Sequence, residues 1–250
     1  MRLLLNLRSL KDSAYDSKYY HKLQGLIYNS LRSHYSPLHD KNGYKFFCFS
    51  NIFPIQDMKE GEARNLIISS PDSALLKLLQ ENLPENINIG DISFQIEKSR
   101  IINPKLNNPS RILAATPIVM RIPQWTYPDY GIQSDKSYVY WRKSYPFNAF
   151  IRQIEANLFK KYNEFYNTSL EEFPIFEQFI FKKETCNPAI IDGKEYPLIG
   201  SIWEFLFNNL SRDQKKLLEF GLDCGFGERN SLGFGFVNLM KNADRNSNLS

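Results

Sequence analysis

Residues 225–235 read Gly225-Phe-Gly-Glu-Arg-Asn-Ser-Leu-Gly-Phe-Gly235, and an apolar run from Phe236 to Met240 follows them. Four of the twelve glycines of the chain fall within these residues, paired at each end. The pattern predicts a polar loop that leads directly into a strand. Because glycine reaches positive φ at little cost, its backbone amides can turn outward and form a nest for an anion such as phosphate.

Two familiar phosphate-binding motifs do not fit this loop. A dinucleotide fingerprint needs a third glycine where Asn230 stands, and a P-loop needs a Gly-Lys-Ser/Thr sequence, which the chain lacks. A glycine-rich hairpin without any ligand is the structural alternative, and the loop by itself favours neither interpretation. The pattern therefore argues against a nucleotide cofactor and leaves another phosphate ligand open.

The sequence before the loop predicts a series of strands and helices. A Ser211-x-x-Gln214 capping box begins a short helix that Gly221 can end, and this helix leads into the loop. The elements expected upstream of it are a strand, a long helix, a hairpin and a further helix, over 112–122, 147–166, 176–197 and 200–210.

The first half of the chain shows a similar order. Leu3, Leu5 and Leu7 alternate with polar residues, as in a strand with one buried face. The elements expected after this strand are a helix, two strands, a helix and one more strand or hairpin, over 18–33, 44–53, 63–70, 72–82 and 87–102. The helix over 18–33 leaves Tyr28 off its apolar stripe, so its hydroxyl is expected to reach solvent.

Both halves thus give the order βαββαβ, which predicts an α+β protein of two tandem ferredoxin-like domains, a topology shared with the RNA-recognition module. The expected boundaries are 1–105 and 106–242, with a frayed tail over 243–250. Neither half carries the aromatic ribonucleoprotein signature on a strand. Base stacking on an open sheet is therefore not supported.

Composition narrows the class of protein. The net charge is only +4, but residues 1–50 hold eight basic side chains against three acidic ones. This local excess of positive charge either attracts a polyanion or belongs to an ordinary solvated surface. Cys48, Cys186 and Cys224 lie far apart, so neither a disulfide framework nor a zinc site is indicated. The apolar runs are too short for a membrane span. We expect a cytoplasmic protein with no membrane partner.

Tyr28, His39 and Lys45 form a candidate catalytic set near the N-terminus. RNA carries its own nucleophile, the 2′-hydroxyl, so cleavage needs a proton acceptor, a proton donor and a positive charge at the phosphate. Imidazole, phenol and ammonium groups supply these functions without a metal. Each residue alone is more often a surface or packing residue. His34 and His21 compete with His39, which we prefer because of its loop position.

The two ends of the chain together resemble a known family. The segment 19–30, the spacing from Tyr28 through Leu38-His39 to Lys45-Phe46-Phe47, and the glycine-rich loop are similar to the CRISPR-associated endoribonucleases of the RAMP superfamily, which cut precursor CRISPR RNA within its repeats. The C-terminal glycine signature is the most specific part of this resemblance. The chain length and the paired ferredoxin-like halves agree with it.

The resemblance implies a cofactor-free, metal-independent transesterification that leaves a 2′,3′-cyclic phosphate and a 5′-hydroxyl. Tyr28, His39 and Lys45 match the catalytic residues of the family. The cleft between the halves would hold the repeat RNA, with Arg229 on a phosphate and Asn230 and Ser231 as hydrogen-bond donors. The loop residues expected to bind RNA are Gly225, Gly227, Arg229, Asn230, Ser231, Gly233 and Gly235.

Several alternatives stay open from the sequence. A non-catalytic RNA-binding subunit of a CRISPR effector complex would share the fold and the loop, and a protein scaffold would need no RNA at all. The sequence does not decide whether effector subunits bind the chain or whether it forms a homodimer. One region of the sequence is rich in aromatic residues: Tyr127, Tyr130, Tyr138, Tyr140 and Trp141. These rings either stack RNA bases or pack in a core or interface, and packing is favoured.

Overall fold

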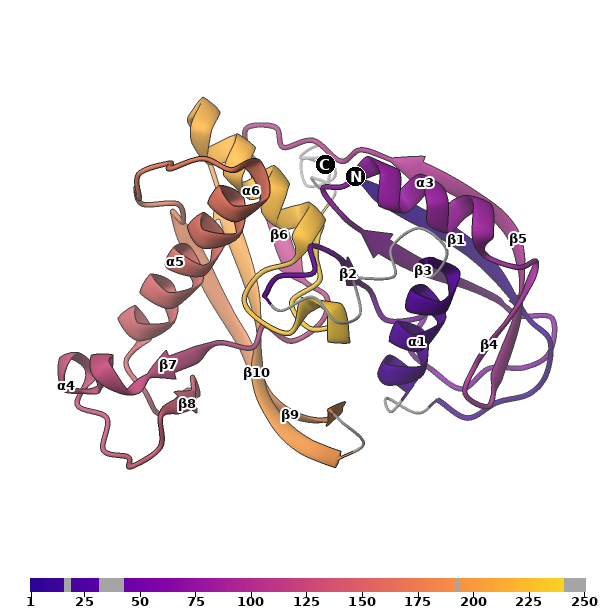
Figure 1. The fold of residues 1–250 in the computed structure, drawn as a ribbon, viewed down its shortest axis with the longest axis horizontal. Helices are drawn as coiled ribbons and strands as arrows, with labels where there is room; N and C mark the ends of the chain where they lie inside the picture. Colours follow the sequence, from indigo (N-terminus) through magenta and orange to yellow (C-terminus); the bar gives the residue numbers. More distant parts are fainter. Residues whose placement is uncertain (16–18, 32–42, 192–193, 241–250) are drawn as a thin grey trace, which may run out of the picture.

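The computed structural model describes residues 1–15, 19–31, 43–191 and 194–240 (Figure 1). Its first sheet is antiparallel and has the strand order β2-β3-β1-β5-β4. Helices α1 and α3 lie against it. The bounds of these elements are β1 (Arg2–Ser9), α1 (Tyr20–Leu31), β2 (Cys48–Phe49), β3 (Ala63–Ser69), α3 (Ser73–Asn82), β4 (Asn86–Ile89) and β5 (Ile92–Ile102).

Local sequence explains how this first unit forms. Leu3, Leu5 and Leu7 of β1 are buried on one face of the sheet, as their alternation predicts. The Asp72 side chain accepts hydrogen bonds from the backbone amides of Ala74 and Leu75 at 2.9 and 3.2 Å, so it caps α3. The buried face of β1 packs in one core with α1 and α3, and Leu4 on its other face packs in a cluster with Phe236 of the second unit.

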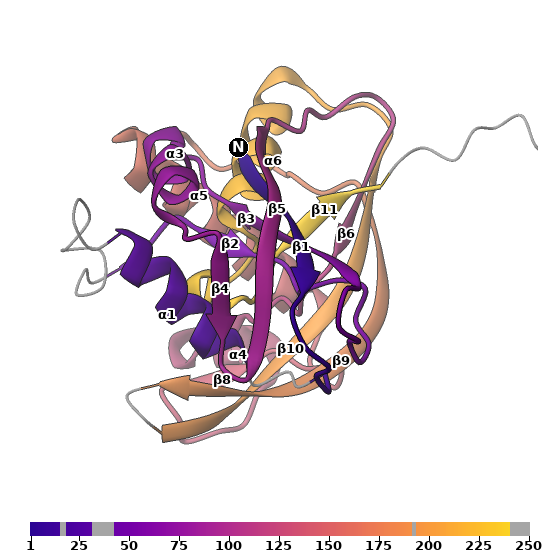
Figure 2. The ribbon, with the colours of Figure 1, turned by 90° about the vertical axis from the view of Figure 1, so that its right-hand side faces the viewer.

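The second sheet is also antiparallel and has the order β11-β6-β10-β9. Helices α5 and α6 belong to this unit, and β9 and β10 form a long curved hairpin that reaches toward α1 (Figure 2). The bounds are β6 (Ser110–Ala114), α5 (Phe147–Tyr166), β9 (Gln178–Ile191), β10 (Lys194–Phe207), α6 (Arg212–Cys224) and β11 (Val237–Leu239). An insertion after β6 contains β7 (Arg121–Pro123), η2 (Gln124–Thr126), α4 (Tyr127–Tyr130) and β8 (Tyr138–Tyr140).

The two units share one topology, which confirms the predicted fold class. In both, the last strand of the βαββαβ order pairs with the first, and the first pairs with the third: β5-β1-β3-β2 and β11-β6-β10-β9. The first sheet ends at Ile102 and the second begins at Ser110. The division into domains over 1–105 and 106–242 stays a prediction, and the tail 243–250 lies outside the described residues.

The expected helix over 200–210 is wrong, because β10 continues to Phe207. Trp203, Phe205 and Phe207 alternate along this segment, and all three are buried in the second core. The apolar residues of this segment fit the spacing of a helix as well as that of a strand. The burial of every second residue identifies it as a strand. The expected strand over 44–53 is likewise reduced to the two residues of β2.

The helix opened by the predicted capping box is confirmed, but its end is not. The Ser211 hydroxyl accepts from the Gln214 amide at 3.2 Å, and the Gln214 side chain accepts from the Ser211 amide at 2.9 Å. The expected end at Gly221 is wrong, since α6 continues to Cys224. A Cβ at Gly221 would lie 2.4 Å from a ring carbon of Phe226, so this glycine makes room for packing.

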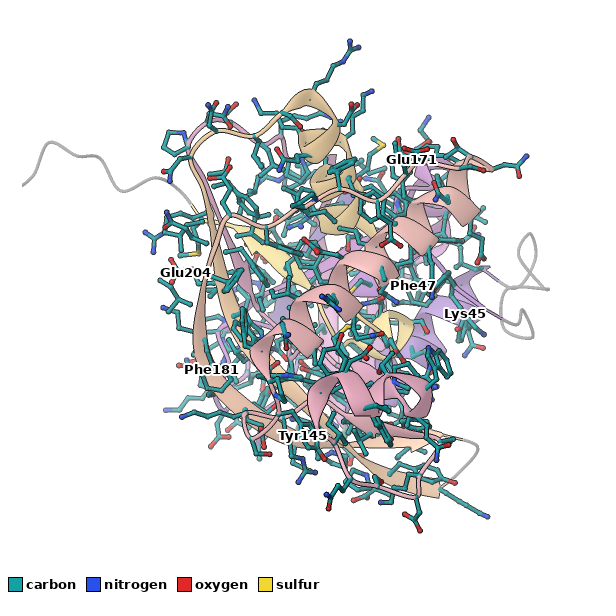
Figure 3. The ribbon with its side chains drawn as sticks, turned by 90° about the vertical axis from the view of Figure 1, so that its left-hand side faces the viewer. Lys45, Phe47, Tyr145, Glu171, Phe181 and Glu204 are labelled. Carbon is teal, nitrogen blue, oxygen red and sulfur yellow. The ribbon has the colours of Figure 1, made fainter. Side chains whose placement is uncertain are left out.

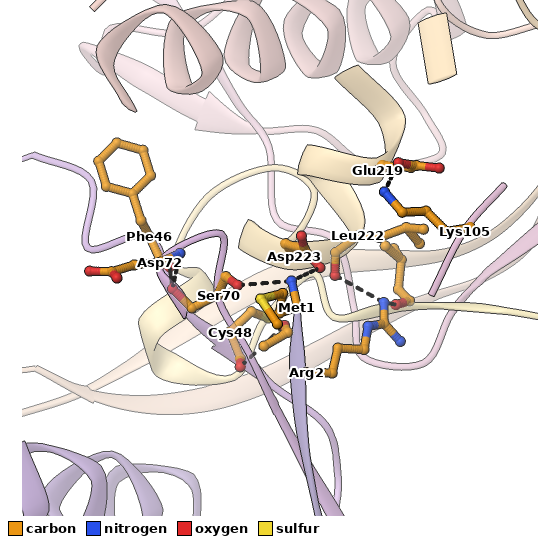
Figure 4. Close-up of polar contacts among 12 residues, drawn as sticks. Met1, Arg2, Phe46, Cys48, Ser70, Asp72, Lys105, Glu219, Leu222 and Asp223 are labelled. Carbon is orange, nitrogen blue, oxygen red and sulfur yellow. Dashed lines mark hydrogen bonds and ion pairs between the residues drawn. The ribbon is translucent and has the colours of Figure 1, made fainter. Parts of the chain in front are cut away.

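Arg2 joins the two units (Figure 4). Its side chain is only 1% exposed, and its guanidinium donates to the carbonyl oxygens of Leu222 and Val237 at 2.9 and 2.6 Å and to Asn238 Oδ1 at 2.7 Å. Burial lowers the pKa of Arg2 to about 10. Figure 1 shows the segment after α6, in yellow, lying between the two units beside β2. The glycine-rich loop is therefore part of the junction.

Candidate active site

A cleft of about 720 Å³ opens where α1, the segment 43–47 and the glycine-rich loop meet. Tyr28 and Lys45 line it from the first unit. Arg229, Asn230 and Ser231 line it from the loop near the other end of the chain. The fold thus brings Tyr28 and Lys45 together with Arg229, Asn230 and Ser231. The predicted glycines Gly225, Gly227, Gly233 and Gly235 are not among the residues that line the cleft.

Tyr28 and Lys45 form the wall of the cleft in the first unit. The Lys45 ammonium lies 5.4 Å from the centroid of the Tyr28 ring, and the edge of that ring packs against Phe47 with centroids 5.7 Å apart. Figure 3 shows Lys45 and Phe47 next to each other, on the side of the view opposite Phe181 and Glu204. The positive charge of Lys45 and the phenol of Tyr28 therefore lie side by side in the wall of the cleft.

The hydroxyl of Tyr28 is buried, so the expectation that it reaches solvent is wrong. The ring packs against the first core, although it lies off the main apolar stripe of α1. Burial raises the pKa of Tyr28, and interactions with Ser231 and Gln24 act in the opposite direction. The phenol is consequently protonated at neutral pH and can donate a hydrogen bond.

The four glycines of the loop are buried and serve the path of the loop itself. Gly235 has a φ of +71°, and a Cβ there would lie 1.9 Å from the carbonyl oxygen of Phe226. The amides of Gly225, Gly233 and Gly235 donate to carbonyl oxygens of the protein at 2.8–2.9 Å. These three amides therefore face the protein and do not form a nest for an outside anion.

Lys161 of α5 supports the loop from inside. Its side chain is 2% exposed, and its ammonium donates to the carbonyl oxygens of Gly225 and Gly227 and to Asn230 Oδ1, the last at 2.6 Å. Burial lowers the pKa of Lys161. No motif marks this residue in the sequence. Its position, seven residues after Ile154 and three after Leu158 on the buried stripe of α5, is the signal that could have indicated it.

Asn230 also belongs to the interior of the loop. Its amide nitrogen donates to the carbonyl oxygens of Phe226 and Phe234 at 3.0 and 2.9 Å, while its oxygen accepts from Lys161. Both ends of this amide are therefore engaged within the protein. Its side chain closes the loop around the Lys161 ammonium.

Arg229 and Ser231 are the half-exposed loop residues that line the cleft beside Asn230. Arg229 adopts a left-handed conformation with φ of +60° at the start of η3 (Asn230–Leu232). The adjacent Glu228 pairs with Arg121 of β7. Its amide also donates to the Val119 carbonyl oxygen at 2.8 Å, which fixes the backbone of the loop.

Of the three histidines, His21 alone lies within the residues that the structure describes. His39, the preferred acid-base residue, and His34 lie outside the described residues. His21 lines a smaller pocket between α1 and the β9–β10 hairpin, with Ala189 and Glu195 among its neighbours. In the part of the chain that is described, no three His, Cys, Asp or Glu side chains are grouped so that they could hold a metal ion.

The predicted aromatic region separates into two groups. Tyr127, Tyr130 and Trp141 are buried in the second core, as the packing interpretation expects. Tyr138 and Tyr140 are half-buried on β8.

Within the described ranges, no helix is both long and apolar enough to span a membrane.

Comparison with known proteins gives the family of the chain. The family model described as CRISPR associated protein Cas6, C-terminal, matches residues 102–239. CRISPR-associated endoribonuclease Cas6 2 of Methanocaldococcus jannaschii is 30% identical over 258 aligned residues, which cover 96% of this chain and 100% of that relative. The family model thus matches more than half of the chain, and the relative matches it along nearly its whole length.

Solved structures agree at the level of the fold. A structure described as CRISPR associated protein Cas6 aligns with a TM-score of 0.70 and 22% identity, covering 96% of this chain and 99% of that chain. An RAMP protein described as binding different RNA substrates aligns with a TM-score of 0.71 and 20% identity, covering 96% and 100%. With the sequence matches, these structures lead to one conclusion: the chain belongs to the CRISPR-associated Cas6 family.

Proposed function

We propose that this protein is an endoribonuclease that cleaves precursor CRISPR RNA within its repeats. One observation carries the proposal: Tyr28 and Lys45 of the first unit face Arg229 and Ser231 of the glycine-rich loop across one cleft. A protonated phenol and two cations in one concave site suit a phosphodiester. The relative from Methanocaldococcus jannaschii is named as a CRISPR-associated endoribonuclease, which supports this reaction class.

The proposed reaction is a transesterification that needs no metal. The 2′-hydroxyl oxygen attacks the adjacent phosphorus as its proton is removed, and a bond forms between the 2′-oxygen and phosphorus. The bond from phosphorus to the 5′-oxygen breaks, and that oxygen takes up a proton. The products are a 2′,3′-cyclic phosphate and a 5′-hydroxyl, so atoms and charges balance without a cofactor.

We assign the first-unit residues by their chemistry. Lys45 places a positive charge where negative charge develops on the phosphate oxygens, which is the largest effect available to such a site. Tyr28, kept protonated by burial, donates a hydrogen bond to the reacting group once bound RNA draws the hydroxyl out of its buried position. His39 transfers the proton, and this assignment depends on the sequence and the resemblance alone. His34 stays the competing imidazole.

The loop supplies the second wall in this proposal. Arg229 pairs with a phosphate of the RNA backbone, and the Ser231 hydroxyl donates to the same strand. Asn230 and the glycines Gly225, Gly227, Gly233 and Gly235 act by holding these two residues in place. This division follows from the internal hydrogen bonds of Asn230 and the burial of the glycines.

Cleavage of a labelled repeat RNA in excess EDTA tests the reaction. A matched RNA carries one 2′-deoxy nucleotide directly upstream of the cut and lacks the nucleophile. We expect the first RNA to be cut, the second to be bound intact, and the product to end in a cyclic phosphate. Binding of both RNAs without cutting, with or without added divalent metal, would contradict the proposal and favour a non-catalytic RNA-binding subunit.

Two variants test the choice of histidine. His39→Ala is expected to abolish cutting and to leave repeat binding within about threefold of wild type, whereas His34→Ala cuts normally. The reverse pattern would move the proton transfer to His34 and keep the reaction class. RNA binding is measured with the 2′-deoxy repeat, so binding and cutting are read separately.

The proposal extends to partners and location. The processed RNA passes to subunits of a CRISPR effector complex, and the protein acts in the cytoplasm, where its RNA substrate is made. Light scattering during gel filtration, with and without the 2′-deoxy repeat, distinguishes a monomer from a homodimer. Co-purification of effector subunits with the product-bound protein tests the transfer.

A further inference from the structure

The ribbon formed by β7 and β8 has one face in the core and one face outside. Ile122 and Val139 are cross-strand partners, and both pack in the second core. Successive side chains of a strand point to opposite faces, so the residues on either side of this pair point away from the core. The outer face of the ribbon therefore carries Arg121, Tyr138 and Tyr140.

The outer face is already ordered for stacking. The rings of Tyr138 and Tyr140 have centroids 5.6 Å apart at an angle of 71°, and both side chains are half-buried. The Arg121 guanidinium lies 5.0 Å from the centroid of the Tyr138 ring. We call Arg121, Tyr138 and Tyr140 the aromatic ledge. Held rings of this kind lose little conformational freedom when a further planar group stacks on them.

The aromatic ledge is continuous with the cleft. Arg121 itself lines the cleft, and its guanidinium pairs with Glu228 of the glycine-rich loop. Tyr140 and Leu232 both pack against one small buried cluster that includes Val119 and Phe234, and Leu232 also lines the cleft. The ledge therefore adjoins the cleft at Arg121.

We propose that the aromatic ledge stacks one unpaired base of the RNA, next to the nucleotides held in the cleft. This inference rests on the proposed function. Every base has a π-face, so tyrosine rings bind unpaired bases with little dependence on sequence, and a guanidinium beside them adds attraction for the strand. The ledge therefore selects an unpaired nucleotide at a fixed distance from the cut.

Single 2-aminopurine substitutions through the repeat RNA test the ledge, because stacking quenches the fluorescence of this base. The RNA also carries the 2′-deoxy nucleotide, so it stays intact on the protein. We expect quenching at one position near the cut. Tyr138→Leu or Tyr140→Leu removes this quenching and weakens binding roughly 5- to 150-fold, while Tyr138→Phe and Tyr140→Phe stay within about twofold of wild type.

A matched control uses Tyr166 at the end of α5, whose ring is 52% exposed and contacts Phe220 of α6. Tyr166→Leu is expected to leave both quenching and affinity unchanged. The ledge is refuted if the quenched position and the affinity are the same in wild type and in both ledge Leu variants. It is also refuted if quenching by wild type occurs at no position.

The two proposals can fail separately. If wild type cuts the repeat but the ledge variants bind as wild type does, the ledge is wrong and the proposed function stands. If wild type neither binds nor cuts any repeat, the proposed function is wrong, and the proposal that the ledge stacks a base of that RNA is wrong as well. A protein partner as the occupant is indicated if the ledge variants lose a protein contact and keep full RNA affinity, which also overturns the inference.

Discussion

The ammonium nitrogen of Lys161 lies 3.0 Å from the carbonyl oxygen of Gly225, and both groups are buried. Lys161 therefore connects α5 to the first residue of the glycine-rich loop. Carbonyl and amide oxygens surround its charge on the loop side, and each of them would lose a hydrogen bond without it. The shape of the loop wall of the cleft thus depends on a buried lysine.

Lys161→Met should lower the free energy of unfolding by roughly 2–5 kcal/mol, because it leaves buried oxygens of the loop without a donor. RNA cleavage should fall with it as the loop loses its shape. Urea unfolding gives the stability, and cleavage is measured well below the midpoint. The exposed neighbour Lys160 is the control, since Lys160→Met is expected to stay within about 0.5 kcal/mol of wild type. Equal effects of both substitutions would contradict the role of Lys161.

Gly235→Ala should prevent the loop from forming. The new Cβ would lie 1.9 Å from a backbone oxygen, and φ is +71°, so both contact and conformation oppose it. Gly131→Ala separates these causes, because Gly131 also has a positive φ of +62° but has no atom within 4 Å of the added Cβ. We expect a loss of about 1–2 kcal/mol at Gly131 and a much larger loss at Gly235 in thermal unfolding. Similar losses would argue against the contact.

Lys45→Ala should slow cleavage about 10²- to 10³-fold in single-turnover experiments, because the phosphate loses a fixed positive charge. Lys45→Arg keeps the charge and should recover part of the rate. Tyr28→Phe should lower the rate without weakening binding of the 2′-deoxy repeat, since only the phenol hydroxyl is removed. If the Lys45→Ala rate matches wild type while binding weakens, Lys45 binds RNA and takes no part in the reaction.

Arg229→Ala should make repeat binding less sensitive to salt. Each phosphate contact to a single strand contributes a slope of about 0.7 to the dependence of log affinity on log salt, so the slope should fall by about that amount. Anisotropy titrations from low to moderate salt measure it. Lys216 of α6, which pairs with Asp213 on the surface, provides the control. A slope unchanged by Arg229→Ala would contradict the phosphate contact.

Tyr44 should make the protein less stable in alkali. Burial, with a smaller contribution from the charge of Glu228, raises the pKa of Tyr44 to about 12, above the ordinary value of about 10 for a tyrosine. The folded state therefore keeps a proton that the unfolded state loses between these pH values, and wild type loses stability as pH rises through that window. The free energy of unfolding of wild type minus that of Tyr44→Phe should be constant below about pH 10. Above that pH the difference should decrease, because only wild type carries the titrating phenol. A constant difference up to pH 12 would contradict the shift.

Local patterns predicted much of the fold. The alternation of Leu3, Leu5 and Leu7 and the Ser211–Gln214 capping box each act over a few residues, so the sequence carried them directly. The segment ending at Phe207 was mistaken for a helix because its apolar residues fit both periods. Only pairing with β6 and β9 decides between them, and that pairing is a property of the assembled sheet.

The site was less accessible to sequence reasoning. Tyr28 and Lys45 were named through chemistry and resemblance, but no local pattern says that they meet Ser231 across the junction. Lys161 was missed because its role depends on oxygens of a loop far along the chain. The glycines were expected to serve a ligand, whereas the buried contacts of Gly235 are with the protein itself. Long-range packing accounts for each difference.

Arg2 has a consequence for the synthesis of the protein. Its guanidinium donates to oxygens of Leu222, Val237 and Asn238, so this residue of the first strand lacks these partners until the ribosome has added at least 220 further residues. The first sheet can begin to fold much earlier, since units fold in order as a nascent chain emerges. The cleft cannot be complete until β11 has been released. A growing chain therefore presents no finished site to the cellular transcripts around the ribosome.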